Sequence, residues 1–316
     1  MKASPADAAV LPRRAIIKEE RFLFWRNFWK LIQDLSRDRV ATMGVLIVFI
    51  VVFAALAAPL VAPYDPTKQN LAKRLTPPSW APGGDPKYWL GTDQLGRDIL
   101  SRIIYGGRVS LAVGLSVVAI AGAFGIFIGL ISGYFGGRTD DILMRLTDIQ
   151  TAFPGLLLAL TIITMIGPSV RNIIIVLSIN GWMVYARITR GIMLSLRETP
   201  FVDAARVIGC RHGRIIFRHA LPNLLSPLLT LTTLELARII LAEASLSFLG
   251  LGVQPPAASW GLMIADGHQY ITRGWWLVTF PGLAIALTVF GVNLIASWLR
   301  TYSDPTQRYR QIRTVE

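Results

Sequence analysis

The sequence predicts an all-α integral membrane protein with about six membrane-spanning helices. Of its 316 residues, 53% are hydrophobic and only 16% are charged, an apolar excess larger than a soluble domain needs to fill its core. The excess is gathered in stretches of roughly 20 residues, the length of helix that crosses a ~30 Å hydrocarbon layer. The predicted spans are residues 41–62, 109–135, 142–168, 171–195, 223–244 and 276–300.

The segments that join these spans differ in composition. Residues 1–40 mix basic, acidic and aromatic side chains, which is typical of an amphipathic helix lying on the inner membrane surface. Residues 63–108 and 245–275 are rich in Pro and Gly, and we expect both to be external. Residues 199–222 then form a cytoplasmic loop and residues 301–316 a cytoplasmic tail. The first span is too long and too far from the N-terminus for a cleaved signal peptide, so we expect it to remain as an anchor.

The distribution of positive charge orients the chain. The net charge is +13, which on its own also permits binding to nucleic acid. With both termini in the cytoplasm, 21 Lys and Arg residues lie on the cytoplasmic side and 9 on the opposite side. This positive-inside bias explains the charge without a nucleic-acid partner and predicts cytoplasmic termini.

Glycine and proline mark two features of the spans. Gly125, Gly129 and Gly133 form two overlapping G-x-x-x-G units in the second span, which predict close approach of another helix. Three later spans contain a proline that removes an internal hydrogen bond and favours a kink unless a neighbour compensates. These prolines are Pro154, Pro227 and Pro281.

The cytoplasmic loop at residues 199–222 has a helical pattern with interruptions. Thr199 and Pro200 suit the N-cap and first residue of a short helix. Glycines at positions 209 and 213 then interrupt the pattern, and Leu221-Pro222 closes it. The sequence therefore predicts two short helices joined by a turn, a shape that fits a cleft in another protein.

This loop resembles the coupling-loop signature of ATP-binding cassette (ABC) importer permeases, an acid-Ala-Ala unit, three residues, Gly, and later Leu-Pro. Asp203 stands where Glu is more usual, and His219 stands where an aliphatic residue is frequent. The matching positions are Asp203, Ala204, Ala205, Gly209, Leu221 and Pro222.

Three further segments narrow the resemblance to the C-type permease of dipeptide and oligopeptide importers. They are LGTDQLGRDILSRIIYGGRVSL (90–111), SLSFLGLGVQPPAASWG (245–261) and TFPGLAIALTVFGVNL (279–294). The resemblance implies a type I importer permease in the bacterial inner membrane, with both external segments in the periplasm. It implies import of dipeptides or oligopeptides by alternating access, although permeases for nickel, glutathione or other small solutes are closely similar.

The resemblance also implies partners, because such importers combine a second permease, two ABC ATPase subunits and a periplasmic solute-binding protein. The chain's own residues agree with a non-catalytic role. A phosphate-binding P-loop needs glycines and a Lys, but the chain has six lysines, none after Lys87, and no Gly-Lys pair. We therefore expect no cofactor on this chain and place ATP and Mg²⁺ on the partner ATPases.

Charged residues in or near the spans are candidates for function. Glu235 and Arg238 are three residues apart near mid-membrane, where they either line the substrate path or form a buried structural pair. Glu243, near the outer end of the same span, is equally open to a water-facing, docking or path role. Arg145 and Asp148 are expected to pair on one helix face.

Arg97 and Asp98 in the first external segment either contact the binding protein or stabilise a local turn.

Two other functional classes are less well supported. An ion-coupled secondary transporter would use intramembrane acids and broken helices, but it has no need of a coupling loop. An intramembrane enzyme would need a nucleophile and a base, and neither H-E-x-x-H nor G-x-S-x-G occurs in the sequence. One Cys and three scattered His offer no metal-ligand spacing, so we predict neither catalytic residues nor a metal site.

Overall fold

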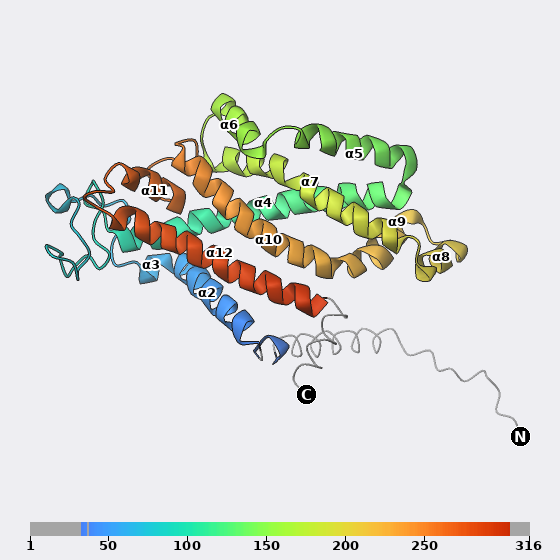
Figure 1. Ribbon diagram of the computed structural model, residues 1–316, viewed down its shortest axis with the longest axis horizontal. Helices are drawn as coiled ribbons and strands as arrows, with labels where there is room; N and C mark the ends of the chain where they lie inside the picture. Colours follow the sequence, from blue (N-terminus) through green and yellow to red (C-terminus); the bar gives the residue numbers. More distant parts are fainter. Residues whose placement is uncertain (1–32, 37, 304–316) are drawn as a thin grey trace, which may run out of the picture.

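The computed structural model describes residues 33–36 and 38–303, so most of the predicted N-terminal segment and tail lie outside the described residues. The described part is a bundle of long helices, and Figure 1 shows their axes running along its length. The long helices are α2 (Arg39–Leu56), α4 (Ile99–Phe135), α7 (Val170–Leu196), α10 (Leu221–Phe248) and α12 (Trp276–Ser303).

Shorter elements connect or flank these helices. They are α3 (Ala58–Val61), a 3₁₀ turn (Leu71–Lys73), α5 (Gly137–Thr151), α6 (Gly155–Ile166), α8 (Pro200–Val207), α9 (His212–Arg214), the π-helix η2 (Ile215–Ala220) and α11 (Trp260–His268). Within the described residues, extended pairing is limited to one isolated bridge between Thr92 and Asp98. The chain is therefore helical throughout its spans, as its composition predicts.

Figure 1 shows α5 and α6 along one edge of the bundle and α2 and α12 along the opposite edge, with α4, α7 and α10 between them. The segment at residues 63–98 and helix α11 lie at one end, and α8 and α9 lie at the other. Because α2 leads into residues 63–98 and α12 leads away from α11, the start of α2 and the end of α12 point away from that first end.

Five helical segments are long and apolar enough to cross a membrane, and a sixth results if α5 and α6 form one span. These two helices meet at an angle of 81°, so the span predicted at residues 142–168 is sharply bent, which confirms the kink predicted at Pro154. The break falls where Pro154 caps α6, because proline disfavours helical backbone in the residue before it. By contrast, α10 and α12 stay helical through Pro227 and Pro281.

The second span begins earlier than predicted, at Ile99 instead of residue 109. Asp98 caps the helix by accepting hydrogen bonds from the Ser101 amide (2.8 Å) and the Ser101 hydroxyl (2.6 Å). Arg102 in the first turn is buried against Asp93. Arginine is compatible with a helix, but a buried arginine needs an acid as its partner, and the sequence alone does not show that Asp93 supplies it.

The tightest packing in the bundle joins α4 to α7 through the predicted glycines. A Cβ added at Gly125 would lie 2.2 Å from the Trp182 carbonyl oxygen, and one at Gly129 would lie 2.5 Å from that of Ala186. Only glycine permits such an approach of two backbones, which confirms the prediction of a packing helix.

We expect Gly129→Ala to destabilise the bundle by about 1–3 kcal/mol, because the added methyl group forces α4 away from α7. The matched control is Gly191→Ala on α7, where a Cβ would meet nothing within 4 Å. Thermal unfolding of the purified protein in detergent measures both changes. Equal melting temperatures for the two variants would contradict this account of the interface.

Candidate coupling, outer and membrane sites

The Asp-Ala-Ala unit of the predicted coupling motif, residues 203–205, lies in helix α8 at one end of the bundle. Thr199 occupies its N-cap and Pro200 its first position, as predicted, but the Thr199 hydroxyl donates to the Leu196 carbonyl (2.5 Å) and does not cap α8. The helix ends in a Schellman motif. The Cys210 amide donates to the Ala205 carbonyl (3.0 Å), and the Gly209 amide donates to the Arg206 carbonyl (2.9 Å).

Helix α8 has one anchored face and one free face in this chain. Val202 is fully buried, and Ala205 and Cys210 pack against the same apolar cluster. Asp203 lies exposed and forms an ion pair with Arg206 at 3.0 Å. Beside them Val207 is 87% exposed and Ile208 is 80% exposed. Large apolar side chains this exposed are typical of a surface that a partner covers.

Sequence reasoning missed Val207 and Ile208. The available signal was a pair of aliphatic residues directly before Gly209, at the end of the predicted short helix. Of the other motif residues, Ala204 is exposed, whereas Leu221 is partly buried against the apolar cluster.

The second predicted short helix is not separate, and Leu221-Pro222 does not close the segment. Helix α9 continues through η2 directly into α10, so residues 212–248 form one helical stretch. The Leu221 amide donates to the carbonyl of Ile216, five residues back, which is the hydrogen bond of a π-helix. This wider turn precedes Pro222, which lacks an amide hydrogen and occupies the first turn of α10.

Tyr134 links the C-terminal end of α4 to helices α8 and α9. Its hydroxyl hydrogen-bonds with His212 Nδ1 at 2.8 Å, and the Arg206 guanidinium lies over its ring at 5.6 Å from the centroid. One aromatic side chain of a long helix thus contacts both α8 and α9. Tyr134 thus connects α4 directly to both helices of this end.

Two ion pairs join α5 to α7. Asp140 accepts from Arg190 Nε at 2.5 Å and also contacts the Ser132 hydroxyl, while Asp148 pairs with Arg187 at 2.6 Å. The predicted pairing of Asp148 with Arg145 is wrong, because Arg187 on the neighbouring helix takes the Asp148 carboxylate.

At the end of the bundle opposite α8, which we call the outer end, buried charges hold residues 93–102 together. Asp93 accepts from Arg97 Nε at 2.6 Å and also contacts Arg102, and Asp266 of α11 lies 3.7–3.8 Å from both guanidinium groups. Arg97 is 8% exposed and Asp98 is 3% exposed.

Arg97 and Asp98 therefore form contacts within this chain, and neither has a free side chain for contact with a binding protein. Nor do they pair with each other, because Arg97 binds Asp93 while Asp98 caps α4. Burial raises the pKa of Asp98, and its hydrogen bonds from Ser101 oppose that shift.

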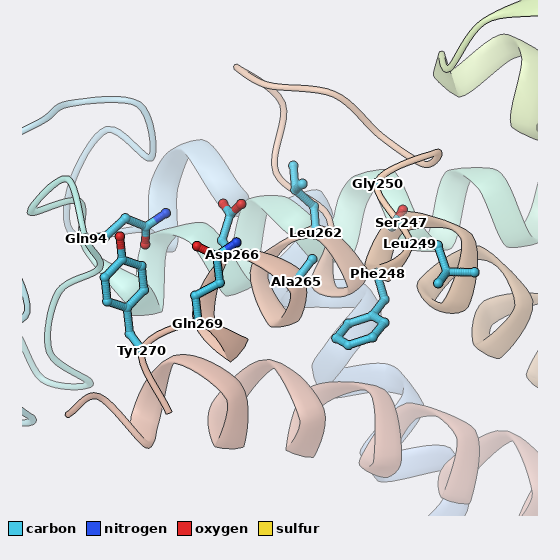
Figure 2. Close-up of a pocket in the computed structure, with 10 residues that line it drawn as sticks. All are labelled: Gln94, Ser247, Phe248, Leu249, Gly250, Leu262, Ala265, Asp266, Gln269 and Tyr270. Atoms are coloured by element: carbon cyan, nitrogen blue, oxygen red, sulfur yellow. The ribbon is translucent and has the colours of Figure 1, made fainter. Parts of the chain in front are cut away.

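A cavity of about 370 Å³ lies beside this cluster. Figure 2 shows Gln94, Asp266, Gln269 and Tyr270 at one end of the cavity and Phe248 and Leu249 at the other. The Oε1 atom of Gln94 is buried without a hydrogen-bond partner in the described residues. The cavity thus combines an acid and amides with an apolar wall at the end of α10.

Glu243 lies deeper and is fully buried, so it has no water-facing role in this conformation. Its carboxylate accepts from Ser110 of α4 (3.0 Å) and from Ser247 of α10 (2.8 Å). Ser247 also accepts from the Val253 amide and lies 3.4 Å from the Ser259 hydroxyl. The network ties α4 and α10 to the loop before α11.

Glu235 and Arg238 form the predicted pair on α10. Glu235 Oε2 accepts from Arg238 Nε at 2.9 Å and from Nη2 at 2.7 Å. The two partners are not equally buried, because the Glu235 side chain is 9% exposed whereas that of Arg238 is 55% exposed. The acid is therefore structural, and the guanidinium remains accessible.

Helix α8, with its exposed apolar side chains, thus lies at one end of the bundle, and the buried charges of residues 93–102 lie at the other. Residues 125–309 match the family described as binding-protein-dependent transport system inner membrane component. The chain belongs to this family. Residues 24–78 also match the N-terminal transmembrane domain of oligopeptide transport permease C.

Relatives match the chain over almost all of its length. The di/tripeptide transport system permease protein DppC of Pseudomonas aeruginosa is 44% identical, over 96% of this chain and 97% of the relative. The dipeptide transport system permease protein DppC of Escherichia coli is 43% identical, over 89% of this chain and 92% of the relative. The DppC protein of Haemophilus influenzae is 40% identical, over 89% and 93%.

The fold also has a solved counterpart. A structure of the MetNI methionine ABC transporter in inward-facing conformations superposes with a TM-score of 0.54 at 16% identity. The match covers 64% of this chain and 96% of the other chain. It confirms the predicted ABC importer permease fold. The apolar helices and the family together indicate a multi-pass protein of the inner membrane.

Proposed function

We propose that this permease imports dipeptides or oligopeptides from the periplasm to the cytoplasm by alternating access, paired with a second permease subunit. The observation that carries the proposal is identity of 40–44% to three permeases named for dipeptide or di/tripeptide transport, over 89–96% of this chain. Both termini are cytoplasmic in this arrangement, and residues 63–98 and α11 face the periplasm.

Energy enters from two ABC ATPase subunits that bind ATP and Mg²⁺, and the chain itself is non-catalytic. Helix α8 is the element that seats in an ATPase, with Asp203, Ala204 and the exposed Val207 and Ile208 on the contact surface. Contacts of Tyr134 with Arg206 and His212 then carry the movement of α8 into α4. The two permeases rock against each other, and the site opens outward or inward.

A periplasmic solute-binding protein delivers the peptide at the opposite end. Support comes from the rigidity of that end, where Asp93, Arg97 and Arg102 fix the external segment to α4 and α11. The binding protein docks on a surface that is already ordered before binding. This order lowers the entropic cost of association, because the permease surface does not have to become ordered on docking.

Uptake into proteoliposomes tests this proposal. The vesicles contain both permeases and the ATPases. The binding protein and a labelled dipeptide are added on the side of the membrane that corresponds to the periplasm, and ATP is added on the opposite side. We expect ATP-dependent accumulation of the dipeptide that neither nickel nor glutathione reduces. Accumulation of nickel or glutathione without any peptide would overturn the substrate class while leaving the permease family intact.

A further inference from the structure

A second cavity, of about 300 Å³, lies between α6, α7 and α10, and it differs from the outer cavity by its apolar walls. Its lining comprises Gly155, Leu156, Ala159, Leu177, Asn180, Gly181, Arg238, Ile239, Leu241, Ala242 and Ser245. Two strongly polar side chains, Asn180 and Arg238, therefore face a mostly aliphatic space.

The amide of Asn180 has no partner in the described part of the chain. Its Oδ1 and Nδ2 atoms are both shielded from solvent, and neither forms a hydrogen bond. A buried polar group left unsatisfied costs about 1–3 kcal/mol, so an unpaired amide on a cavity wall indicates a ligand that pairs with it. Gly155 faces this amide, and even an added Cβ there would lie 4.0 Å from Oδ1.

Arg238 supplies positive charge to the same cavity. Its Nε and Nη2 atoms bind Glu235, and no bond of Nη1 occurs among the described residues. Across the cavity, the first turn of α6 has no side-chain cap, so its amide groups add partial positive charge. A guanidinium, an amide and an uncapped helix start together favour a carboxylate.

We infer that this cavity binds the C-terminal residue of the transported peptide, with the carboxylate at Arg238 and Asn180. This inference rests on the proposed function. The C-terminal residue of a peptide presents a carboxylate that accepts hydrogen bonds and an amide N–H that donates one. Asn180 Nδ2 pairs with the first and Oδ1 with the second, while the aliphatic walls take a side chain of any apolar kind.

The test compares uptake of a dipeptide with uptake of the same dipeptide amidated at its C-terminus, in proteoliposomes of the complete transporter. We take the uptake rate of the free dipeptide divided by that of the amidated one, and we compare this ratio between permease variants. The comparison cancels the preference of the binding protein, which is the same for every variant. Asn180→Asp places a second carboxylate against that of the peptide with almost no change in shape. We expect the ratio to fall about tenfold or more, equivalent to ~1.4 kcal/mol.

The control variant is Arg171→Gln, which removes an exposed cation from α7 away from the cavity, and it should keep the wild-type ratio. An unchanged ratio in Asn180→Asp, with uptake still active, would overturn the inference. Absence of peptide uptake by the wild-type transporter is a different result, because it would contradict the proposed function and not only this inference.

A second measurement applies if Asn180→Asp does not assemble. A double variant, Ser245→Cys with Cys210→Ser, keeps Asn180 and Arg238 and places the only thiol of this chain on the cavity wall. We expect the free dipeptide to slow labelling of this thiol by a methanethiosulfonate reagent in the ATP-bound transporter, and the amidated dipeptide to leave it unchanged. Equal labelling rates with both peptides would refute the carboxylate subsite.

Discussion

Replacement of Asp93 by Ala should destabilise the outer end of this permease more than any other single loss of charge in that region. Asp93 is 1% exposed and is the closest acid to two buried guanidinium groups, those of Arg97 and Arg102. The other acid, Asp266, lies at 3.7–3.8 Å and is 28% exposed. Removal of one partner from a buried ion pair typically costs about 3–5 kcal/mol, because the remaining charges stay buried.

Asp93 also organises the backbone, which adds to the expected loss. Its Oδ1 atom accepts from the Leu95 amide (2.8 Å) and the Arg97 amide (2.9 Å). Asp93→Asn keeps the shape and an oxygen acceptor but removes the charge, so its effect separates the two contributions.

Thermal unfolding and proteolysis of the external segment measure the effect of Asp93→Ala. We expect a lower melting temperature and faster cleavage between residues 63 and 98. The matched control is Asp85→Ala in the same segment, where Asp85 pairs with a half-exposed Lys73 and should contribute little. Similar behaviour of the two variants would show that the buried cluster does not hold this end together.

The spans that could be predicted well are those whose signal is local. The fourth span was predicted at residues 171–195, and α7 occupies Val170–Leu196, because its length and apolar content alone define it. The glycines at 125, 129 and 133 were also informative, since small residues at this spacing have one common use in membranes.

The features that could not be predicted depend on partners far away in the chain. The burial of Arg102 in the first turn of α4 depends on Asp93 and Asp266, and Asp148 binds Arg187, 39 positions away. Pro222 was read as a helix break, but the π-helical turn before it lets the helix continue. In each case local propensity gives way to a tertiary contact or to backbone geometry that the sequence does not display.

The same distinction applies to the candidate sites. The position of α8 could be predicted from its motif, whereas its contact with Tyr134 through Arg206 joins residues 72 positions apart. The sequence predicts that Glu235 and Arg238 have the same environment, because the pair either lines the substrate path or is buried as a structural pair. The structure separates them, because Glu235 is enclosed while Arg238 faces a cavity whose other polar wall, Asn180, lies on a different helix.

Gly209, two residues beyond the end of α8, is the position where we expect a substitution to abolish transport without preventing membrane insertion. Its φ of +83° lies in the left-handed region, and a Cβ added there would meet nothing within 4 Å. Any penalty therefore comes from backbone conformation and not from a clash. A left-handed residue other than Gly costs roughly 1–2 kcal/mol, and a β-branched one costs more.

A substitution at Gly209 affects function because this residue belongs to the Schellman motif that closes the C-terminal end of α8. If the residue at 209 leaves the left-handed region, the Cys210 and Gly209 amides lose the Ala205 and Arg206 carbonyls, and the last turn of α8 opens. Arg206, Val207 and Ile208 lie in that turn or directly after it, so the contact with Tyr134 and the exposed apolar surface are displaced together. The ATPases then move without moving α4.

Gly209→Val should thus reach the membrane in normal amount, assemble, and lose at least about tenfold of its ATP-driven uptake, since ~1.4 kcal/mol is a tenfold change in population. Asn tolerates the left-handed region, so Gly209→Asn should retain more uptake than Gly209→Val. Gly213→Val is the matched control, because that glycine has the same open surroundings but ordinary helical backbone. Substrate-stimulated turnover at the wild-type rate in Gly209→Val would mean that α8 transmits motion without its C-terminal cap, and the coupling role would then rest on its anchored face at Val202 and Ala205.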